Sequence, residues 1–268
     1  MKGLHGLSRS VKMCVRDFFR LFGLDIRRIP PFESYAWLRE WQIRTILDIG
    51  ANVGQFASQI HRVLPDAMIY SFEPLEDCYN QLIGKMGHLP GFQAFNLALG
   101  DRNGREQIYR NDYTPSSSLL PVDDLLRQSF PFAAHATAQE IQIRRLDDVA
   151  RELALAEPIL IKIDVQGTED KVILGGGNVF AKASILIVEM SFATLYKGQA
   201  LFDTVYDLLR EKGFIHMGIE GIIRNPKDGR VLQCDSLFVR REHDVSGKGE
   251  RVSNVHGSTA VLSDRSLA

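Results

Sequence analysis

Residues 45–64 read TILDIGANVGQFASQIHRVL, and this stretch decides the fold class. The apolar run Thr45–Ile49 predicts a buried strand, and residues 53–64 carry apolar side chains at helical spacing. The same order follows at once, because a second apolar run at Met68–Phe72 precedes a helical pattern at residues 77–86. Strands that alternate with helices form parallel βαβ units, so the sequence predicts an α/β fold.

The alternation continues toward the C-terminus. Further strands are expected at residues 92–99, 159–165 and 185–190, with a helix from 169 to 174 and an amphipathic helix from 201 to 212. Gly213 ends that last helix, and residues 214–223 and 231–240 flank the turn sequence NPKDG. This pair predicts an antiparallel strand at the edge of the sheet.

The chain divides into a central domain at residues 45–241, a leader at 1–44 and a tail at 242–268. Within the domain the strand–helix rhythm breaks between residues 100 and 149, which predicts an insertion at 102–145 that covers the pocket. Strands at 106–110 and 141–144, a loop at 115–118 and a helix at 122–128 are expected there. The tail is rich in Ser, Gly and charge and is predicted to be disordered.

The leader is basic, and two interpretations of it stay open. Residues 1–30 hold seven Lys or Arg against two Asp, and apolar residues recur at helical spacing from 8 to 22. A basic amphipathic helix at 8–22 could contact an anionic membrane surface. Packing on the domain or on a second subunit, as in a homo-oligomer, is the interpretation we favour.

Composition excludes several classes. The 268 residues include 32 Lys and Arg against 33 Asp and Glu, a formal net charge of −1 that argues against a nucleic-acid-binding protein. The three cysteines, Cys14, Cys78 and Cys234, are too far apart for a disulfide scaffold or a zinc ribbon. No apolar run approaches the roughly 18 residues of a transmembrane helix, and no secretory signal pattern is present. The expected location is cytoplasmic.

The first candidate site is the turn after the first strand, DIGANVG at residues 48–54. Gly50, Ala51, Asn52 and Gly54 place a tight backbone turn before a helix N-terminus, which can approach a ligand closely. A dinucleotide fingerprint requires glycine where Asn52 stands, so a nicotinamide-dependent oxidoreductase is a weaker alternative.

Two acids complete this candidate ligand site. Asp48 precedes the turn and suits a cationic ligand end, since it would repel phosphate. Glu73 ends the second strand and has the lone pairs to accept both hydroxyls of a ribose. Together these acids describe S-adenosylmethionine.

A second candidate site combines two acids on neighbouring strands. Asp164 lies at the carboxyl end of the strand at 159–165, and Glu189 lies near the end of the next strand. They could act as a general base on a hydroxyl or hold one hard cation such as Mg²⁺. Alternatively, each acid could cap a helix or form an ion pair, for which Lys162 is a candidate partner. Asn96, after the third strand, could approach an adenine or only form a turn.

Several segments together resemble the FkbM-type S-adenosylmethionine-dependent methyltransferases. They are LDIGANVGQFA (47–57), SFEP (71–74), NLALGD (96–101), SSSLL (116–120), IKIDVQGTEDKVILGG (161–176), VEMSFATLYKGQALFDTVYDLLREKGF (188–214) and CDSLFVR (234–240). The resemblance implies a class I, Rossmann-like sheet of seven strands, mostly parallel with an antiparallel last strand, and helices on both faces. It also implies that Asp48, Gly50, Asn52 and Gly54 line the cofactor, Glu73 holds the ribose, Asn96 lies near the adenine and Asp164 lies nearest the methyl.

The expected function is methylation of a hydroxyl on a sugar, polysaccharide or secondary metabolite. Asp164 or Glu189 would remove the hydroxyl proton, directly or through a cation that acidifies it. A non-catalytic scaffold that binds S-adenosylmethionine is the alternative. This alternative is disfavoured because a site that had lost its activity would not need to keep the acids Asp48, Glu73 and Asp164.

Overall fold

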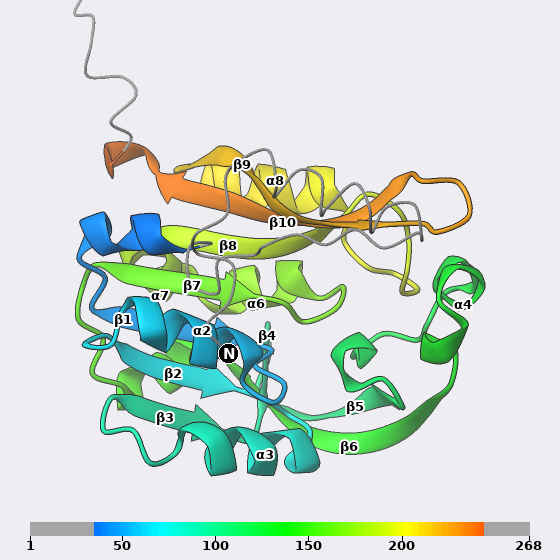
Figure 1. Ribbon diagram of the computed structural model, residues 1–268, viewed down its shortest axis with the longest axis horizontal. Coiled ribbons are helices and arrows are strands. Elements are labelled where there is room, and N and C mark those ends of the chain that lie inside the picture. The colour runs from blue at the N-terminus through cyan, green and yellow to red at the C-terminus, as the bar shows by residue number, and fades with distance from the viewer. Residues whose placement is uncertain (1–34, 244–268) are drawn as a thin grey trace, which may run out of the picture.

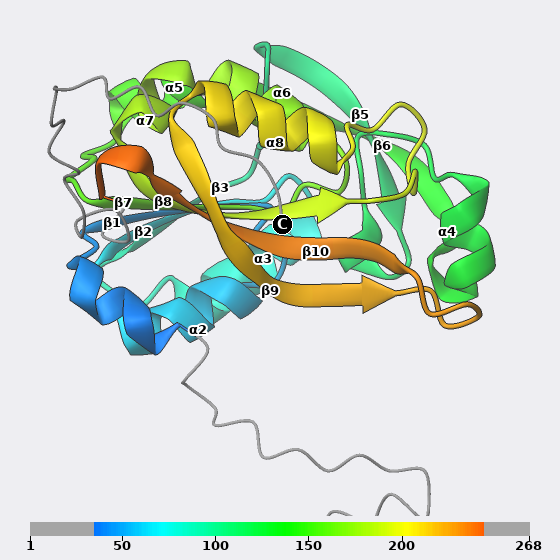
Figure 2. The same ribbon diagram turned by 90° about the horizontal axis from the view of Figure 1, so that it is seen from above.

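A twisted sheet of seven strands forms the centre of the protein, with helices on both faces (Figures 1 and 2). The computed structural model describes residues 35–243. The strand order is β3-β2-β1-β7-β8-β10-β9. The strands are β1 (Thr45–Ile49), β2 (Met68–Phe72), β3 (Phe92–Phe95), β7 (Ile159–Ile163), β8 (Ala183–Ser191), β9 (Phe214–Arg224) and β10 (Val231–Arg240). The predicted α/β class with a mostly parallel seven-stranded sheet is confirmed.

The predicted antiparallel strand pair at the edge of the sheet is confirmed, and the outermost of its two strands is β9 rather than β10. β10 pairs antiparallel with β8 on one side and with β9 on the other. The helix before β9 carries the chain past the neighbour position of β8, and the turn then returns β10 into the gap. β9 is therefore the edge strand.

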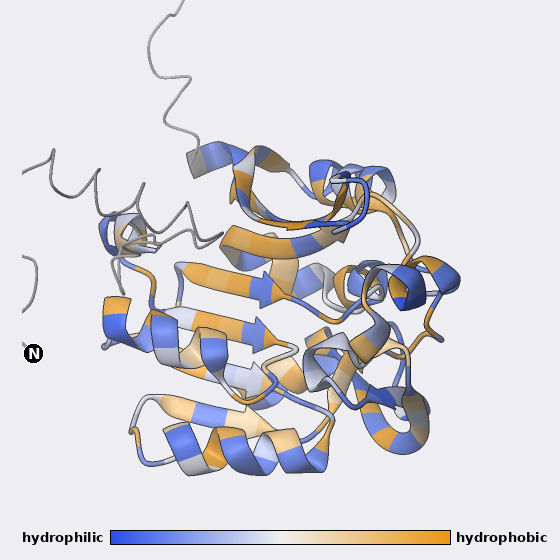
Figure 3. Ribbon diagram, turned by 45° about the vertical axis from the view of Figure 1, so that its right-hand side comes forward, coloured by the Kyte–Doolittle hydropathy of each residue, from blue (hydrophilic) through white to orange (hydrophobic). Residues whose placement is uncertain are grey.

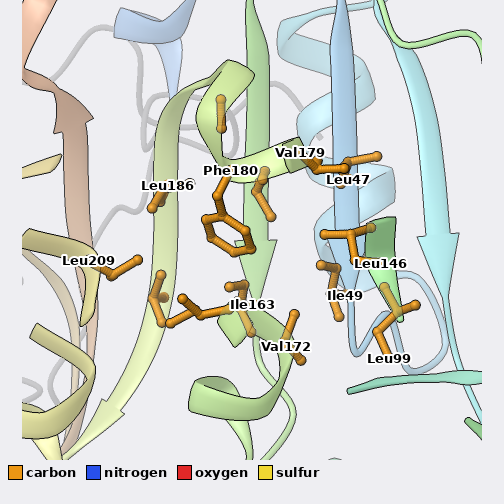
Figure 4. Close-up of a cluster of buried hydrophobic side chains, with 14 of the residues drawn as sticks. Leu47, Ile49, Leu99, Leu146, Ile163, Val172, Val179, Phe180, Leu186 and Leu209 are labelled. Atoms are coloured by element: carbon orange, nitrogen blue, oxygen red, sulfur yellow. The ribbon is translucent and has the colours of Figure 1, made fainter. Parts of the chain in front are cut away.

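Each face of the sheet is covered by its own set of helices. One face packs against η1 (Ala36–Trp41), α2 (Gln55–Val63) and α3 (Glu76–Met86). The other packs against α5 (Leu146–Val149), α6 (Glu169–Gly175), α7 (Gly177–Lys182) and α8 (Phe202–Glu211), with the short turn η4 (Ala150–Glu152) after α5. Figure 4 shows this second core, in which Val172, Phe180 and Leu209 from the helices meet strand residues such as Ile163 and Leu186. Every residue of β1 and of β8 is buried, as expected for central strands of a covered parallel sheet.

The predicted third strand at 92–99 belongs to two sheets. β3 ends at Phe95, and β4 (Ala98–Gly100) pairs instead with β6 (Ala136–Arg145), which pairs in turn with β5 (Gly104–Asn111). The break lies at Asn96, whose side-chain amide donates to the carbonyl oxygens of Glu73 and Pro74, both at 3.0 Å. The chain turns there and starts the second, three-stranded sheet.

The region of the predicted insertion carries more structure than the sequence indicated. Between β5 and β6 lie η2 (Thr114–Ser116), α4 (Asp124–Ser129) and η3 (Pro131–Ala133). The backbone of α6 packs directly on the backbone of β4 at Gly175. A β carbon at this position would stand 1.8 Å from the carbonyl oxygen of Gly100, so glycine is required for the contact. The described chain ends with η5 (Arg241–His243).

Hydropathy along the ribbon follows the layers, with apolar strands inside and mixed helices outside (Figure 3). Within residues 35–243, no helix is both long and apolar enough to cross a bilayer. The predicted helix at 8–22, its membrane or subunit contact, and all but the first two residues of the predicted tail lie outside the described residues.

Candidate active site

A cavity of about 360 Å³ opens at the carboxyl ends of β1, β2 and β7. This volume lies in the range of roughly 300–1,000 Å³ that is typical of small-molecule sites. Five of the predicted site residues line it, namely Gly50, Ala51, Asn52, Glu73 and Asp164. Its wall also includes Tyr35, residues 97–99, residues 113–115 and 117–119, and Gln166.

The glycine turn after β1 forms one wall of the cavity. Gly50 has φ +82°, and a β carbon there would stand 1.8 Å from the carbonyl oxygen of Asp164. Only glycine allows this approach, which joins the tips of β1 and β7. Gly54, at φ +79°, is the N-cap of α2 and lies against Leu82 rather than on the cavity surface. The first N–H groups of α2 have no partner within the helix, and Gln55 and Phe56 line the cavity.

Asp48 lies behind this turn instead of facing the cavity. It is fully buried, and Ser71 Oγ donates to Asp48 Oδ2 at 3.2 Å. Its Oδ1 has no hydrogen-bond partner among the described residues. Burial raises the pKa of Asp48 to about 6, although Lys162 acts in the opposite direction. Because Asp48 does not line the cavity, the expected direct contact between its carboxylate and a cationic ligand end is not supported.

Glu73 lines the cavity and is held by two backbone donors. Its Oε1 accepts from the N–H of Leu75 and its Oε2 from the N–H of Asn52, each at 2.8 Å. Burial nevertheless raises the pKa of Glu73 to about 7. Each oxygen keeps a lone pair for a ligand hydroxyl. Asn96 does not line the cavity, and its amide fixes the backbone of Glu73, so the structure favours its turn-forming interpretation.

Asp164 is the acid that the structure places on the cavity wall at the end of β7. Lys162 Nζ lies 2.9 Å from Asp164 Oδ2, so the ion pair considered from the sequence is present. The Lys162 ammonium also lies 5.6 Å from the ring centre of Phe56. Burial lowers the pKa of Lys162, but the charges of Asp164 and Asp48 outweigh it, and the net shift is upward. Lys162 is therefore a fixed positive charge beside the cavity.

Glu189 is buried and does not line the cavity. Its Oε2 accepts from Gln166 Nε2 at 2.6 Å and from Gln233 Nε2 at 2.9 Å. Burial, followed by the charge of Asp164, raises the pKa of Glu189 well above its usual value. The prediction that both acids face one pocket is therefore wrong for Glu189, which lies one step behind Asp164.

The donor groups around these acids do not suit a cation. Asp164 faces an ammonium on one oxygen and an amide N–H of Gln166 on the other. Across residues 35–243, no group of three or more His, Cys, Asp or Glu is arranged to hold a metal ion. A role for Asp164 and Glu189 as Mg²⁺ ligands is not supported.

Sequence reasoning missed Gln166, although it lies inside a motif that was recognised. Its amide stands between Asp164 and Glu189, and Tyr196 Oη donates to its Oε1 at 2.8 Å. The segment around η2 was assigned only to a covering loop, yet it forms a wall: Asn52 Nδ2 donates to Thr114 Oγ1 at 3.2 Å. An amide side chain beside a strand-tip acid was the available signal.

The fold and the site define a class. A parallel sheet with one antiparallel strand, a glycine turn after β1 and an acid after β2 around one cavity characterise the class I S-adenosylmethionine-dependent methyltransferases. The chain belongs to the FkbM methyltransferase family, because the profile of the Methyltransferase FkbM domain matches residues 48–215. It is an S-adenosylmethionine-dependent methyltransferase.

The chain is similar to several known proteins. The chain is 31% identical over 233 residues to the 2-O-methyltransferase NoeI of Sinorhizobium fredii, covering 83% of this chain and 96% of NoeI. A solved FkbM methyltransferase from Methylobacillus flagellatus KT has a TM-score of 0.46 at 15% identity, covering 84% of this chain and 50% of that one. Magnesium protoporphyrin IX methyltransferase from Synechocystis, solved with bound S-adenosylmethionine, has a TM-score of 0.43 at 13% identity, with coverage of 89% and 100%.

Proposed function

We propose that the protein methylates a hydroxyl oxygen of a small-molecule or glycan acceptor. The observation that carries the proposal is the Asp164 carboxylate, which stands on the cavity wall with both oxygens held by donors. The relative NoeI, a 2-O-methyltransferase, supports oxygen as the acceptor atom.

The residues around the glycine turn fit S-adenosylmethionine. Glu73 would accept the ribose hydroxyls, and the turn at residues 50–52 would lie against the ligand. When bound, S-adenosylmethionine supplies a methyl group on a sulfonium, which is already reactive. What remains for the protein is to orient the acceptor and to take up its proton.

Asp164 is the better candidate for that proton. It lines the cavity, whereas Glu189 is buried behind it. The raised pKa of Glu189 favours its protonated form, which cannot act as a base. The acceptor hydroxyl would give its proton to Asp164 while its oxygen forms the bond to the methyl carbon, the bond from that carbon to sulfur breaks, and S-adenosylhomocysteine leaves as the neutral thioether.

An aromatic rim beside the cavity suits a ring-shaped acceptor. Tyr113 lines the cavity and is 50% exposed, and Phe132, packed edge-on at 5.2 Å between ring centres, is 62% exposed. The exposure of both rings favours contact with a ligand over a place in the core. A flat apolar rim with nearby polar groups would receive one face of a sugar or a metabolite ring.

The test uses methyl-labelled S-adenosylmethionine with a panel of methyl glycosides and hydroxylated metabolites. We expect label in an ether and a rate that falls at least about 100-fold in Asp164→Asn, the lower end for loss of a general base. Asp101→Asn is the matched control, because its side chain is 34% exposed against 31% for Asp164 and it also has a lysine partner. Label recovered on nitrogen or carbon, or an unchanged rate in a folded Asp164→Asn protein, would refute the proposal.

A further inference from the structure

Gln166 has an unusual backbone for a residue that is not glycine. Its φ is +57°, in the left-handed region that side chains with a β carbon rarely adopt. The residue lines the cavity two positions after Asp164 and is almost fully buried. Strained backbone of this kind persists only where surrounding contacts fix it, and it concentrates at functional sites.

Those contacts use every polar atom of the side chain. Nε2 donates to Asp164 Oδ1 at 2.7 Å and to Glu189 Oε2 at 2.6 Å, which accounts for both N–H bonds. Oε1 accepts from Tyr196 Oη at 2.8 Å, and the backbone carbonyl accepts from Ser118 Oγ at 2.5 Å. One residue thus joins the end of β7, the interior of β8, the loop after β8 and the cavity wall.

We propose that Gln166 is the positioning residue of this site, which holds the Asp164 carboxylate toward the bound methyl donor through its side-chain amide. The inference rests on the proposed function, in which Asp164 takes up the acceptor proton and must therefore lie beside the methyl group that is transferred. Lys162 holds only Oδ2. Without the second donor on Oδ1, the carboxylate is free to turn toward the lysine ammonium and away from the cavity.

The chemistry of the amide explains why glutamine fits this position. A glutamate of the same shape would have no hydrogen to donate and would place a third acid between Asp164 and Glu189. An apolar residue of the same length would leave Asp164 Oδ1 without this buried donor. Glutamine supplies two donors to the acids and an acceptor to Tyr196 at once.

The experiment measures the affinity of the full-length protein for S-adenosylmethionine and for S-adenosylhomocysteine by calorimetry. The two ligands differ in the methyl group and its positive charge, so their affinity ratio reports how well a carboxylate faces the sulfonium. The variants are Gln166→Met, Asp164→Asn and the double variant. Gln233→Met is the matched control, because Gln233 is also a buried glutamine that donates to Glu189 Oε2, at 2.9 Å, and does not line the cavity.

We expect Asp164→Asn to reduce the preference for S-adenosylmethionine by about tenfold, since an opposite charge is lost at short range. Gln166→Met should reduce it severalfold, and the double variant should be no worse than Asp164→Asn alone, because one residue acts through the other. Gln233→Met should leave the ratio unchanged, although it too loses a hydrogen bond to Glu189.

Two results would overturn the inference while the methyl donor assignment stands. One is an equal effect of the Gln166 and Gln233 substitutions, and the other is an additive effect of Gln166→Met and Asp164→Asn. Failure of the proposed function gives a different pattern: the wild-type protein binds neither ligand, or Asp164→Asn leaves the ratio unchanged.

Discussion

Affinity for S-adenosylhomocysteine should depend on pH through one buried acid, Glu73. Its pKa is about 7 in the unliganded protein, because burial outweighs the two backbone N–H groups that its oxygens accept. Ribose hydroxyls donate hydrogen bonds, and such bonds favour the ionised carboxylate. Binding should therefore lower the pKa of Glu73 and release a proton near neutral pH.

The magnitude follows from that value. At pH 8 most Glu73 side chains are ionised, whereas at pH 6 only about one in ten is, so the affinity should be about tenfold lower at pH 6. At pH 7, binding should release about half a proton through this group.

The stability of the unliganded fold should depend on pH in the opposite direction to the affinity. The folded pKa of Glu73 is above its unfolded value of about 4.5, so the contribution of Glu73 to stability falls as pH rises from about 4.5 to 7.

Calorimetric titration between pH 6 and 8, in buffers of different ionisation enthalpy, measures both the affinity and the proton release. Glu73→Gln should bind more weakly at pH 8 and should lose most of the pH dependence. Glu76→Gln, which changes an exposed glutamate three residues further on, should behave as wild type. Asp48 and Glu169, whose pKa values are raised to about 6 and about 7, titrate over the same range, so the difference between the wild type and Glu73→Gln isolates the share of Glu73. An affinity that is flat from pH 6 to 8, or a slope that survives in Glu73→Gln, would refute the reasoning.

Two further substitutions probe the turn and the rim. Gly50→Ala should lower the free energy of unfolding by at least about 3 kcal/mol, because its β carbon would strike the Asp164 carbonyl at positive φ. Gly84→Ala, inside α3 with open space around it, should instead raise that free energy by about 0.5–1 kcal/mol in the same denaturant titration, and similar effects of the two changes would contradict the steric account. Tyr113→Ala should raise KM for the acceptor severalfold while the affinity for S-adenosylhomocysteine stays within about twofold, since removal of a ring contact costs about 1 kcal/mol. If Tyr113→Ala weakened binding of the acceptor and of S-adenosylhomocysteine equally, the aromatic rim would belong to the methyl-donor side of the cavity.

The local pattern of apolar residues was sufficient to predict the first two strands and the site residues at the strand tips. The predicted bounds of β1 and β2 agree with the structure, and Gly50, Glu73 and Asp164 meet at one cavity. These features depend on short runs of apolar residues and on the rule that parallel strands end at the same edge.

The orientation of the acids could not be read in the same way. β1 and β8 are buried on both faces, so their sequences have no alternation to show which way Asp48 or Glu189 points. The bond between Gln166 and Tyr196 joins positions 30 residues apart and depends on the tertiary fold. The departure of β4 from the main sheet also depends on the tertiary fold, because the chain turns away where the Asn96 amide donates to the carbonyl oxygens of Glu73 and Pro74.

The strand order also has a consequence for the growing chain on the ribosome. β1 is synthesised well before its neighbour β7. Thr45 Oγ1 donates a hydrogen bond to the carbonyl oxygen of Ala156, which lies 111 residues further along the chain. Parallel pairing over such a distance is slow to form, since a long loop must close first. Until β7 arrives, the β1 edge that it will cover stays open, and the glycine turn has no Asp164 carbonyl to pack against. The nascent protein therefore gains its capacity to hold the methyl donor only after β7 and Asp164 have been made, and until then the exposed β1 edge leaves it open to aggregation.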